Sequence, residues 1–245
     1  MIPYFAQPVW HIGRLEIHAF GIAAALALNA GFFIVLWRAR VAKLDQHLAA
    51  RLYLLLALAG AIAGHAFLAL LNGGPPWLRI WDGQSATGVA IGGSAAAGIA
   101  YVYLSTIEAD PWAYCNALAF AFPFVWTVLR AGCALAHDHP GRSTHSPFGV
   151  RFPGGTRYDL GLLEFLAAAI LCVVFLVLAH AGWRRFLPLV LIAGGAVRLA
   201  LYPLRLPGAA GSVAGIAVSF LTCIAGLTLL TFGAQGRAGI TTSAR

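Results

Sequence analysis

Residues 159–181, DLGLLEFLAAAILCVVFLVLAHA, decide the fold of this chain. Apart from Asp159, Glu164 and His180, the run is free of ionisable and strongly polar side chains. A helix needs about 20 apolar residues to cross a hydrocarbon core roughly 30 Å thick. Such a span has to be helical because lipid offers the backbone no hydrogen-bond partner. The stretch therefore predicts a transmembrane helix with one acid, Glu164, inside it.

The remainder of the chain has the same apolar character. Of its 245 residues, 60% are hydrophobic and 10% charged, and the mean hydropathy is +0.82, values far from those of soluble globular domains. The sequence predicts an all-α integral membrane protein, a single membrane domain over residues 1–245, with a polar segment at about 134–158. The first span is expected to be retained, not cleaved as a signal peptide. The seven expected transmembrane helices are 17–37, 50–71, 88–105, 112–134, 159–181, 186–203 and 209–233.

Lysine and arginine residues near the span ends predict the orientation. They place the N-terminus outside, the C-terminus in the cytoplasm and the polar segment on the outer face. Three further arginines, Arg142, Arg151 and Arg157, lie in that outer segment, which indicates a role for them other than topology. The residues expected on the cytoplasmic side are Arg38, Arg40, Lys43, Arg51, Arg184, Arg185, Arg237 and Arg245.

The net charge of +8 does not indicate a nucleic-acid partner. The basic residues are scattered over loops and span ends instead of forming one soluble basic face. Anionic lipid is the expected counterpart. Cysteine usage predicts neither a disulfide framework nor a zinc knuckle, because the four residues stand singly in apolar stretches. They are Cys115, Cys133, Cys172 and Cys223.

Three charged side chains stand out in the interior of the predicted spans, Arg130, Arg198 and Glu164. Each costs about 2.5–3.5 kcal/mol on membrane insertion, so such residues usually mark a site. Two arginines and one acid leave excess positive charge that a bound anion would neutralise, and the arginine fork binds two phosphate oxygens at once. The alternative is structural: an arginine pairs with Glu164 or Asp159, or its head snorkels to the interface.

Two predicted helices place several polar side chains on one face, by the helical repeat of about 3.6 residues. If both helices continue without a break, each presents a polar stripe. Gly194 and Gly195 predict close approach of two helices, with lipid headgroup contact as the alternative. The stripes are Arg130, Cys133 and His137 on the fourth span and Arg198, Tyr202 and Arg205 on the sixth.

The polar segment gathers histidines beside a carboxylate, and three interpretations are open. The first is acid/base chemistry or headgroup contact; the second is a metal site built from the two neighbouring histidines and a third; the third is ordinary solvated polarity. Pro140 and Gly141 interrupt helical ligand spacing, so we expect no metal and no cofactor. The residues concerned are His137, Asp138, His139 and His145.

Four stretches together resemble the prolipoprotein diacylglyceryl transferases. RAGCALAHDHPGR (130–142) is similar to the family signature, with Arg130 on its arginine, Gly132 and Cys133 on its Gly-(Asn or Cys) pair, Asp138 on an acidic position and Gly141 on the closing glycine. IWDGQSATGVAIGG (80–93) resembles the segment that opens the third span. RYDLGLLEFL (157–166) resembles the stretch holding a family glutamate at Glu164. GGAVRLALYPLR (194–205) resembles the late helix, with Arg198 and Arg205 on its arginines.

The resemblance implies a seven-span enzyme of the bacterial cytoplasmic (inner) membrane. Such enzymes transfer the diacylglyceryl group of phosphatidylglycerol to a lipobox cysteine thiol and release glycerol phosphate. The implied partners are phosphatidylglycerol or a related anionic phospholipid and a lipoprotein precursor peptide. The resemblance implies Arg130, Arg198 and Asp138 as catalytic residues, and the position of His137 and His139 beside the signature adds these two as candidates. The expected substrate-binding residues are Arg130, Gly141, Arg142, Glu164 and Arg205.

The chain departs from the family pattern at three positions. Thr87 replaces a histidine, Phe20 a tyrosine and Tyr202 a glutamate. One interpretation is an active transferase in which His137 or His139 replaces the missing base, or in which the acceptor has changed. The other is a non-catalytic phospholipid-binding or assembly protein. A solute carrier is less favoured, because no repeated half and no paired broken helices are evident.

Overall fold

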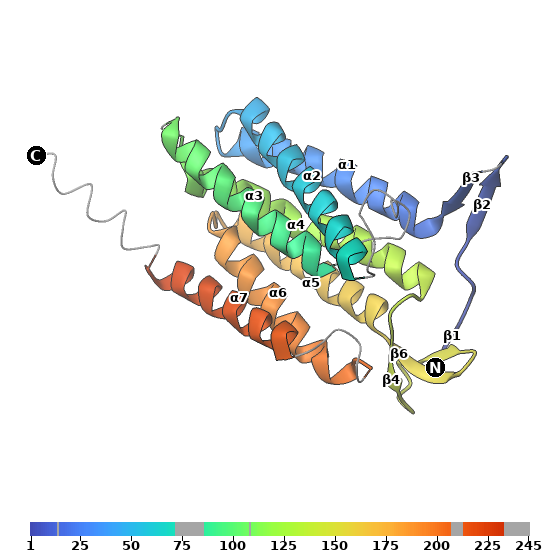
Figure 1. Cartoon of the computed structure of the whole chain (residues 1–245). Helices are drawn as coiled ribbons and strands as arrows, with labels where there is room; N and C mark the ends of the chain where they lie inside the picture. The colour runs from blue at the N-terminus through green and yellow to red at the C-terminus, as the bar shows by residue number, and fades with distance from the viewer. Residues whose placement is uncertain (14, 72–85, 108, 207–212, 233–245) are drawn as a thin grey trace, which may run out of the picture. The chain divides into compact units, whose positions relative to one another are not determined.

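The computed structural model describes residues 1–13, 15–71, 86–107, 109–206 and 213–232. Within these residues the chain forms seven α-helices and two small β-sheets (Figure 1). Each helix lies at one of the seven predicted spans, and most ends agree to within a few residues. The helices are α1 Ala19–Val41, α2 Gln46–Leu71, α3 Ala86–Thr106, α4 Pro111–Ala136, α5 Leu160–His180, α6 Phe186–Leu201 and α7 Val213–Phe232.

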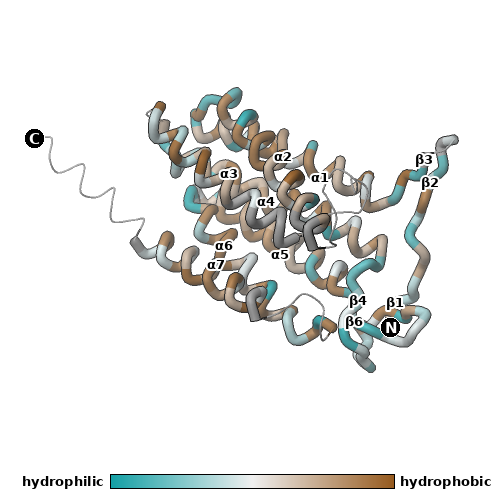
Figure 2. The backbone as a smooth tube through the Cα atoms, in the orientation of Figure 1, coloured by the Kyte–Doolittle hydropathy of each residue, from teal (hydrophilic) through white to brown (hydrophobic). Residues whose placement is uncertain are grey.

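Five of the helices, α1, α2, α4, α5 and α6, are long and apolar enough to cross a bilayer. Figure 2 shows hydrophobic residues along the helices and more hydrophilic ones around β4 and β6. The exposed face of α5 carries strongly apolar side chains, among them Ile170, Val173 and Val177. Such a face suits contact with lipid. A soluble domain would bury most of such a row. The chain is therefore a multi-pass membrane protein.

The seven helices confirm the expected all-α class, and short strands accompany them outside the expected spans. One sheet has the strand order β1-β5-β6-β4, with β1 parallel to β5 and the other pairs antiparallel. The second sheet is an antiparallel hairpin of β2 and β3. The polar segment at 134–158 is thus partly folded as a sheet. The strands are β1 Ile2–Pro3, β2 Val9–Ile12, β3 Leu15–His18, β4 Pro140–Ser143, β5 Val150–Phe152 and β6 Gly155–Asp159.

The chain divides into two compact units. One comprises Met1–Gly31 and Ala119–Arg245, and the other comprises Phe32–Leu118. All the residues that the sequence predicts for the site lie in the first unit. The expectation of one membrane domain stays a prediction.

Three phenylalanines fix the helices of the first unit that carry the predicted site. Phe120 of α4, Phe175 of α5 and Phe186 of α6 have no exposed surface. The ring centroid of Phe186 lies 4.9 Å from that of Phe120 and 5.1 Å from that of Phe175. Such aromatic pairs contribute about 0.5–1.5 kcal/mol beyond their buried area. The cluster therefore holds α4, α5 and α6 together beneath the polar residues.

Helices α6 and α7 approach closely at Gly195, which confirms the packing interpretation at that residue. A Cβ at Gly195 would lie 2.5 Å from Cys223 Sγ and 2.6 Å from the Ser219 carbonyl oxygen. A Cβ at the neighbouring Gly194 would meet nothing within 4 Å. The pair therefore offers a matched test of helix packing.

Gly195→Ala is expected to lower the free energy of unfolding by about 1–3 kcal/mol, because the added methyl group overpacks the contact with α7. Gly194→Ala serves as the control and should be neutral or slightly stabilising, because alanine favours a helix over glycine by about 1 kcal/mol. Reversible unfolding in mixed micelles with increasing dodecyl sulfate measures both. Equal effects of the two variants would contradict the close approach.

Candidate functional site

Glu164 bridges two arginines inside the membrane-spanning part of the first unit. Its side chain is 4% exposed, and Arg130 Nε lies 2.6 Å from Glu164 Oε2. Arg205 Nη2 lies 3.2 Å from Glu164 Oε1. The sequence left open a structural pair between Arg130 and Glu164, and that pair is present. It does not neutralise the site, because a second arginine shares the same carboxylate.

Arg198 adds a third cation to this group. It interacts electrostatically with Glu164, Arg205 and Arg130. Within the described residues the Arg198 guanidinium has no hydrogen-bond or ion-pair partner. Among the described residues, three arginines therefore face one glutamate, which leaves two positive charges without a carboxylate and Arg198 with donors available for an anion. We call Arg130, Glu164, Arg198 and Arg205 the arginine cluster.

The expected polar stripe on the sixth span is wrong for Arg205. Helix α6 ends at Leu201, the next three residues form a short 3-10 helix, Tyr202–Leu204, and Arg205 is extended with φ −74° and ψ 153°. Arg205 therefore reaches Glu164 from a segment beyond the helix. The proline at position 203 and the tight turn move it away from the i+7 position that a continuous helix would give.

The strand β4 supports this segment. Arg142 Nε donates to the Arg205 carbonyl oxygen at 3.0 Å. Gly141 is buried, and a Cβ there would lie 2.6 Å from the Leu204 carbonyl oxygen. Both residues were expected to bind substrate. Their contacts position the backbone that carries Arg205, and substrate contact by either of them stays a prediction.

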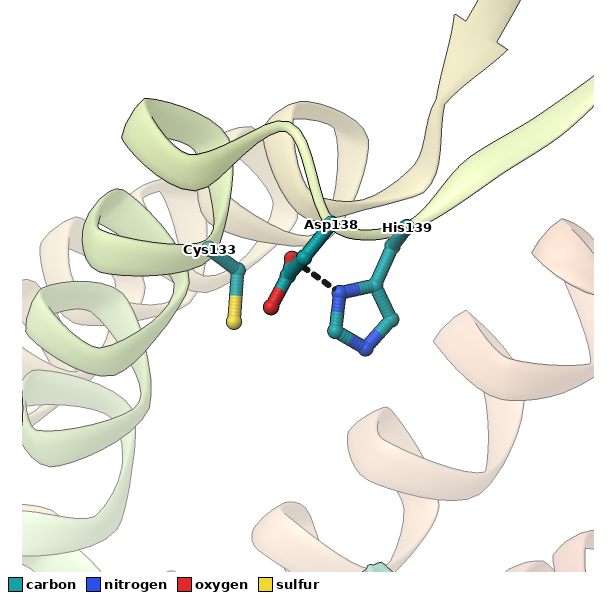
Figure 3. Close-up of side chains that lie close together, drawn as sticks. All are labelled: Cys133, Asp138 and His139. Carbon is teal, nitrogen blue, oxygen red and sulfur yellow. Dashed lines mark hydrogen bonds and ion pairs between the residues drawn. The ribbon is translucent and has the colours of Figure 1, made fainter. Parts of the chain in front are cut away.

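A second group of polar side chains forms where α4 ends. Helix α4 stops at Ala136, and His137 has a positive φ of 50°, which turns the chain sharply. Asp138 and His139 consequently lie back toward Cys133, one turn before the helix end (Figure 3). One ligand atom from each of Cys133, Asp138 and His139 lies within 4.8 Å of the others. We call these three residues the Cys-Asp-His group.

Hydrogen bonds connect this group internally and to the arginine cluster. His139 Nδ1 and Asp138 Oδ1 form a short hydrogen bond, and both side chains are 42% exposed. Arg130 Nη1 donates to Cys133 Sγ at 3.6 Å. Arg130 thus contacts both Glu164 and Cys133. The expectation that Arg130, Cys133 and His137 share one helical face holds for the first two and is wrong for His137, because the helix ends before it.

The environment of His139 favours its charged form. The hydrogen bond with Asp138 is the largest cause that raises the pKa of His139 from 6.5 to about 9, a hydrogen bond with Cys133 adds to it, and burial opposes both. At neutral pH the side chain is therefore an imidazolium ion. The stability it contributes is fully present below about pH 6.5 and is lost as the pH rises through about 9.

Asp138→Asn is expected to lower the pKa of His139 toward 6.5, because the charged hydrogen-bond acceptor is removed. Histidine NMR with labelled imidazole nitrogens measures the titration in detergent-solubilised protein. The NMR signals of His145, which is exposed in the same unit, serve as an internal reference and should be the same in both proteins. A His139 titration that is unchanged by the substitution would contradict the pairing with Asp138.

His137 pairs with a different carboxylate. Its Nδ1 lies 2.6 Å from Asp159 Oδ2, and the two side chains are 4% and 0% exposed. His137 Nε2 is buried and has no hydrogen-bond partner among the described residues. The rings of Tyr4, Phe5 and Phe152 surround the imidazole, with centroids 4.6–5.8 Å away. The structure therefore does not bring His137 and His139 together as metal ligands.

Asp159 has two roles that the sequence did not predict. Asp159 Oδ1 accepts a hydrogen bond from the Leu162 backbone nitrogen at 3.2 Å, which caps the N-terminus of α5. Its other oxygen holds His137. The sequence signal for the cap is the aspartate directly ahead of a long apolar helix. Nothing in the sequence identifies His137 as its partner.

Of two departures from the family pattern, Phe20 and Thr87, the structure describes the side chain of Phe20 alone. Phe20, near the start of α1, lies beside the signature: a Cβ at Gly132 would be 3.3 Å from its ring. The side chain of Thr87 lies outside the described residues, as do residues 80–85 of the stretch that opens the third span.

Comparison with known proteins supports the resemblance along nearly the whole chain. A family model described as prolipoprotein diacylglyceryl transferase matches residues 7–232. No curated protein matches the chain. The matched range includes all seven helices, the arginine cluster and the Cys-Asp-His group. The chain therefore belongs to the prolipoprotein diacylglyceryl transferase family.

Proposed function

We propose that this protein transfers a diacylglyceryl group from phosphatidylglycerol, or a related anionic phospholipid, to a thiol. The acceptor is the lipobox cysteine of a lipoprotein precursor, and the second product is glycerol phosphate. The observation that carries the proposal is the excess positive charge of Arg130, Arg198 and Arg205 around Glu164. Charged side chains at this depth are costly and are retained where they bind a ligand.

The arginine cluster would hold the phosphodiester of the lipid. Arg130 and Arg205 are each oriented by one oxygen of Glu164, so their remaining donors are fixed in direction. Arg198 contributes unpaired donors. Negative charge grows on the phosphate as the carbon–oxygen bond to the diacylglyceryl group breaks, and preorganised cations stabilise that charge more than they stabilise the bound lipid. Glu164 thus orients the arginines without cancelling them.

The Asp138–His139 pair would lie at the leaving-group side of the reaction. The raised pKa of His139 keeps a proton and a positive charge on it at neutral pH. That charge adds to the stabilisation of the departing glycerol phosphate, and Asp138 orients the imidazolium and the headgroup hydroxyls. The family pattern places a carboxylate at this position, which supports the same use of Asp138.

His137 is the residue that we assign as proton acceptor for the incoming thiol. Asp159 holds its Nδ1, so that Nε2 is left with a free lone pair, which is the arrangement of a general base oriented by a carboxylate. Tyr4 and Phe5 cover the ring and would have to move aside for the thiol. A normal rate in the His137→Ala, His139→Ala double variant would contradict both histidine assignments.

The location follows from the family and the charge pattern. We propose seven transmembrane spans in a bacterial cytoplasmic membrane, with the N-terminus and the Cys-Asp-His group at the outer face and the C-terminus in the cytoplasm. Accessibility of single introduced cysteines to a membrane-impermeant maleimide in spheroplasts tests this orientation. Labelling near His145 but not near Arg184 is the expected pattern.

Mass spectrometry tests the reaction. Purified protein is incubated with phosphatidylglycerol and a synthetic lipobox peptide, and the expected products are a peptide heavier by one diacylglyceryl group and free glycerol phosphate. Glycerol phosphate without modified peptide would indicate a different acceptor. Neither product, with phospholipid still co-purifying in an Arg130-dependent manner, would indicate a non-catalytic lipid-binding protein.

A further inference from the structure

The Cys-Asp-His group is a set of potential metal ligands, a property that phosphate binding does not require. It offers one sulfur, one carboxylate oxygen and one imidazole nitrogen, all within 4.8 Å of one another. Figure 3 shows the three side chains converging from the end of α4 and the residues that follow it. Among the residues that the structure describes, no other three His, Cys, Asp or Glu side chains converge in this way. We propose that Cys133, Asp138 and His139 bind a thiophilic divalent cation of the Zn²⁺ type.

The ligand set and its spacing suit such a cation. Zn²⁺ binds thiolate sulfur at about 2.3 Å, imidazole nitrogen at about 2.0–2.1 Å and carboxylate oxygen at about 2.0–2.2 Å. Ligand atoms at those distances from a tetrahedral ion lie roughly 3.3–3.7 Å apart. Small rotations of Asp138 and His139, which are partly exposed, bring atoms that already lie within 4.8 Å to this spacing. Three protein ligands leave the fourth position for water.

Charge balance allows the cation to bind beside an arginine. Cys133 as a thiolate and Asp138 as a carboxylate carry two negative charges, and His139 coordinates as a neutral imidazole. The two positive charges of Zn²⁺ are therefore balanced by its own ligands. Arg130 therefore meets no additional repulsion. Its hydrogen bond to Cys133 Sγ persists and stabilises the thiolate, as an outer-shell donor to a metal ligand does.

Binding has a consequence that rests on the proposed function. Asp138 and His139 cannot both coordinate the cation and act on the lipid headgroup. Occupancy is therefore expected to inhibit diacylglyceryl transfer, and removal of the cation by a chelator is expected to restore it. The site would couple lipid transfer to the supply of the cation.

Cobalt substitution tests the site independently of activity. The detergent-purified full chain is stripped with a chelator, and Co²⁺ is added in steps. We expect one Co²⁺ per chain, with a thiolate-to-cobalt charge-transfer band and the intense visible absorption of four-coordinate Co²⁺; Zn²⁺ should abolish both. Cys133→Ser should remove the charge-transfer band. Cys172→Ser is the matched control and should retain it, because Cys172 lies on α5 with Thr127 as its neighbour.

Several results would overturn the proposal. They are no band in the unsubstituted protein, a band that persists in Cys133→Ser, or a band that disappears in Cys172→Ser. Thermal unfolding of each variant checks its folding. If Cys133→Ser does not fold, His139→Gln replaces it, and an affinity for Co²⁺ within about threefold of the unsubstituted protein would contradict the site. Binding without any transferase activity would support the metal site and contradict the proposed function, so the two can fail separately.

Discussion

Arg130→Ala is expected to lower the rate of diacylglyceryl transfer by about 10²–10³-fold, the effect of removing one preorganised donor to a developing negative charge. Arg130 is the only described arginine that contacts both groups of the site, through Glu164 and through Cys133. Its loss would remove a cation from the proposed phosphodiester clamp and leave Cys133 Sγ without its guanidinium donor. The rate of glycerol phosphate release from phosphatidylglycerol measures the effect.

The substitution is not expected to unfold the protein. Arg205 remains 3.2 Å from Glu164, so that the buried carboxylate keeps one charged partner. Arg130→Lys should recover only part of the rate, because an ammonium group lacks the planar fork that binds two oxygens. Arg151→Ala, an exposed arginine on β5, is the control and should leave the rate unchanged. A similar loss in Arg130→Ala and Arg151→Ala would mean that net charge alone, and no specific clamp, determines the rate.

The sequence predicts the helices well because the insertion of a segment into a membrane depends mainly on its length and its apolar character. Each of the seven predicted apolar runs coincides with a helix of the described residues, and five of these helices are long and apolar enough to cross a bilayer. The ends differ where a helix continues into polar residues. Helix α1 extends to Val41, past Arg38 and Arg40, because backbone hydrogen bonding does not stop at the edge of the apolar run.

The strands could not be predicted in the same way. They are two to five residues long and contain proline or glycine at several positions, for example in β4 Pro140–Ser143. Neither alternation nor β-branched enrichment is visible over so few residues. Their pairing depends on contacts between distant segments, such as β1 at the N-terminus with β5. That information is absent from any local pattern.

The two groups of the candidate site also differ in how far the sequence predicts them. The costs of burying Arg130, Arg198 and Glu164 are intrinsic to those side chains, so the sequence predicts them as a group. The Cys-Asp-His group depends on one backbone angle, the positive φ of His137, which an uninterrupted helical pattern does not indicate. A non-glycine residue in this conformation is uncommon. Here it directs His137 to Asp159 and returns His139 to Cys133.

Asp159→Ala is expected to lower the free energy of unfolding by about 1–3 kcal/mol through the lost hydrogen bond alone, because the buried Nδ1 of His137 is left without its acceptor. The substitution leaves the His137 imidazole buried without a hydrogen bond at either nitrogen. It also removes the side-chain cap of α5, which contributes about 0.5–2 kcal/mol. Unfolding in mixed micelles with increasing dodecyl sulfate measures the change.

A matched cap separates the two contributions at Asp159. Asp45 Oδ1 accepts hydrogen bonds from the backbone nitrogens of His47 and Leu48 at the start of α2, and its side chain holds no histidine. Asp45→Ala should therefore cost only the capping energy, about 0.5–2 kcal/mol. Equal losses at the two positions would show that the His137–Asp159 pair adds nothing to stability. A larger loss at Asp159 means that the pair holds the N-terminal turn of α5, and with it Glu164 and the arginines that Glu164 orients.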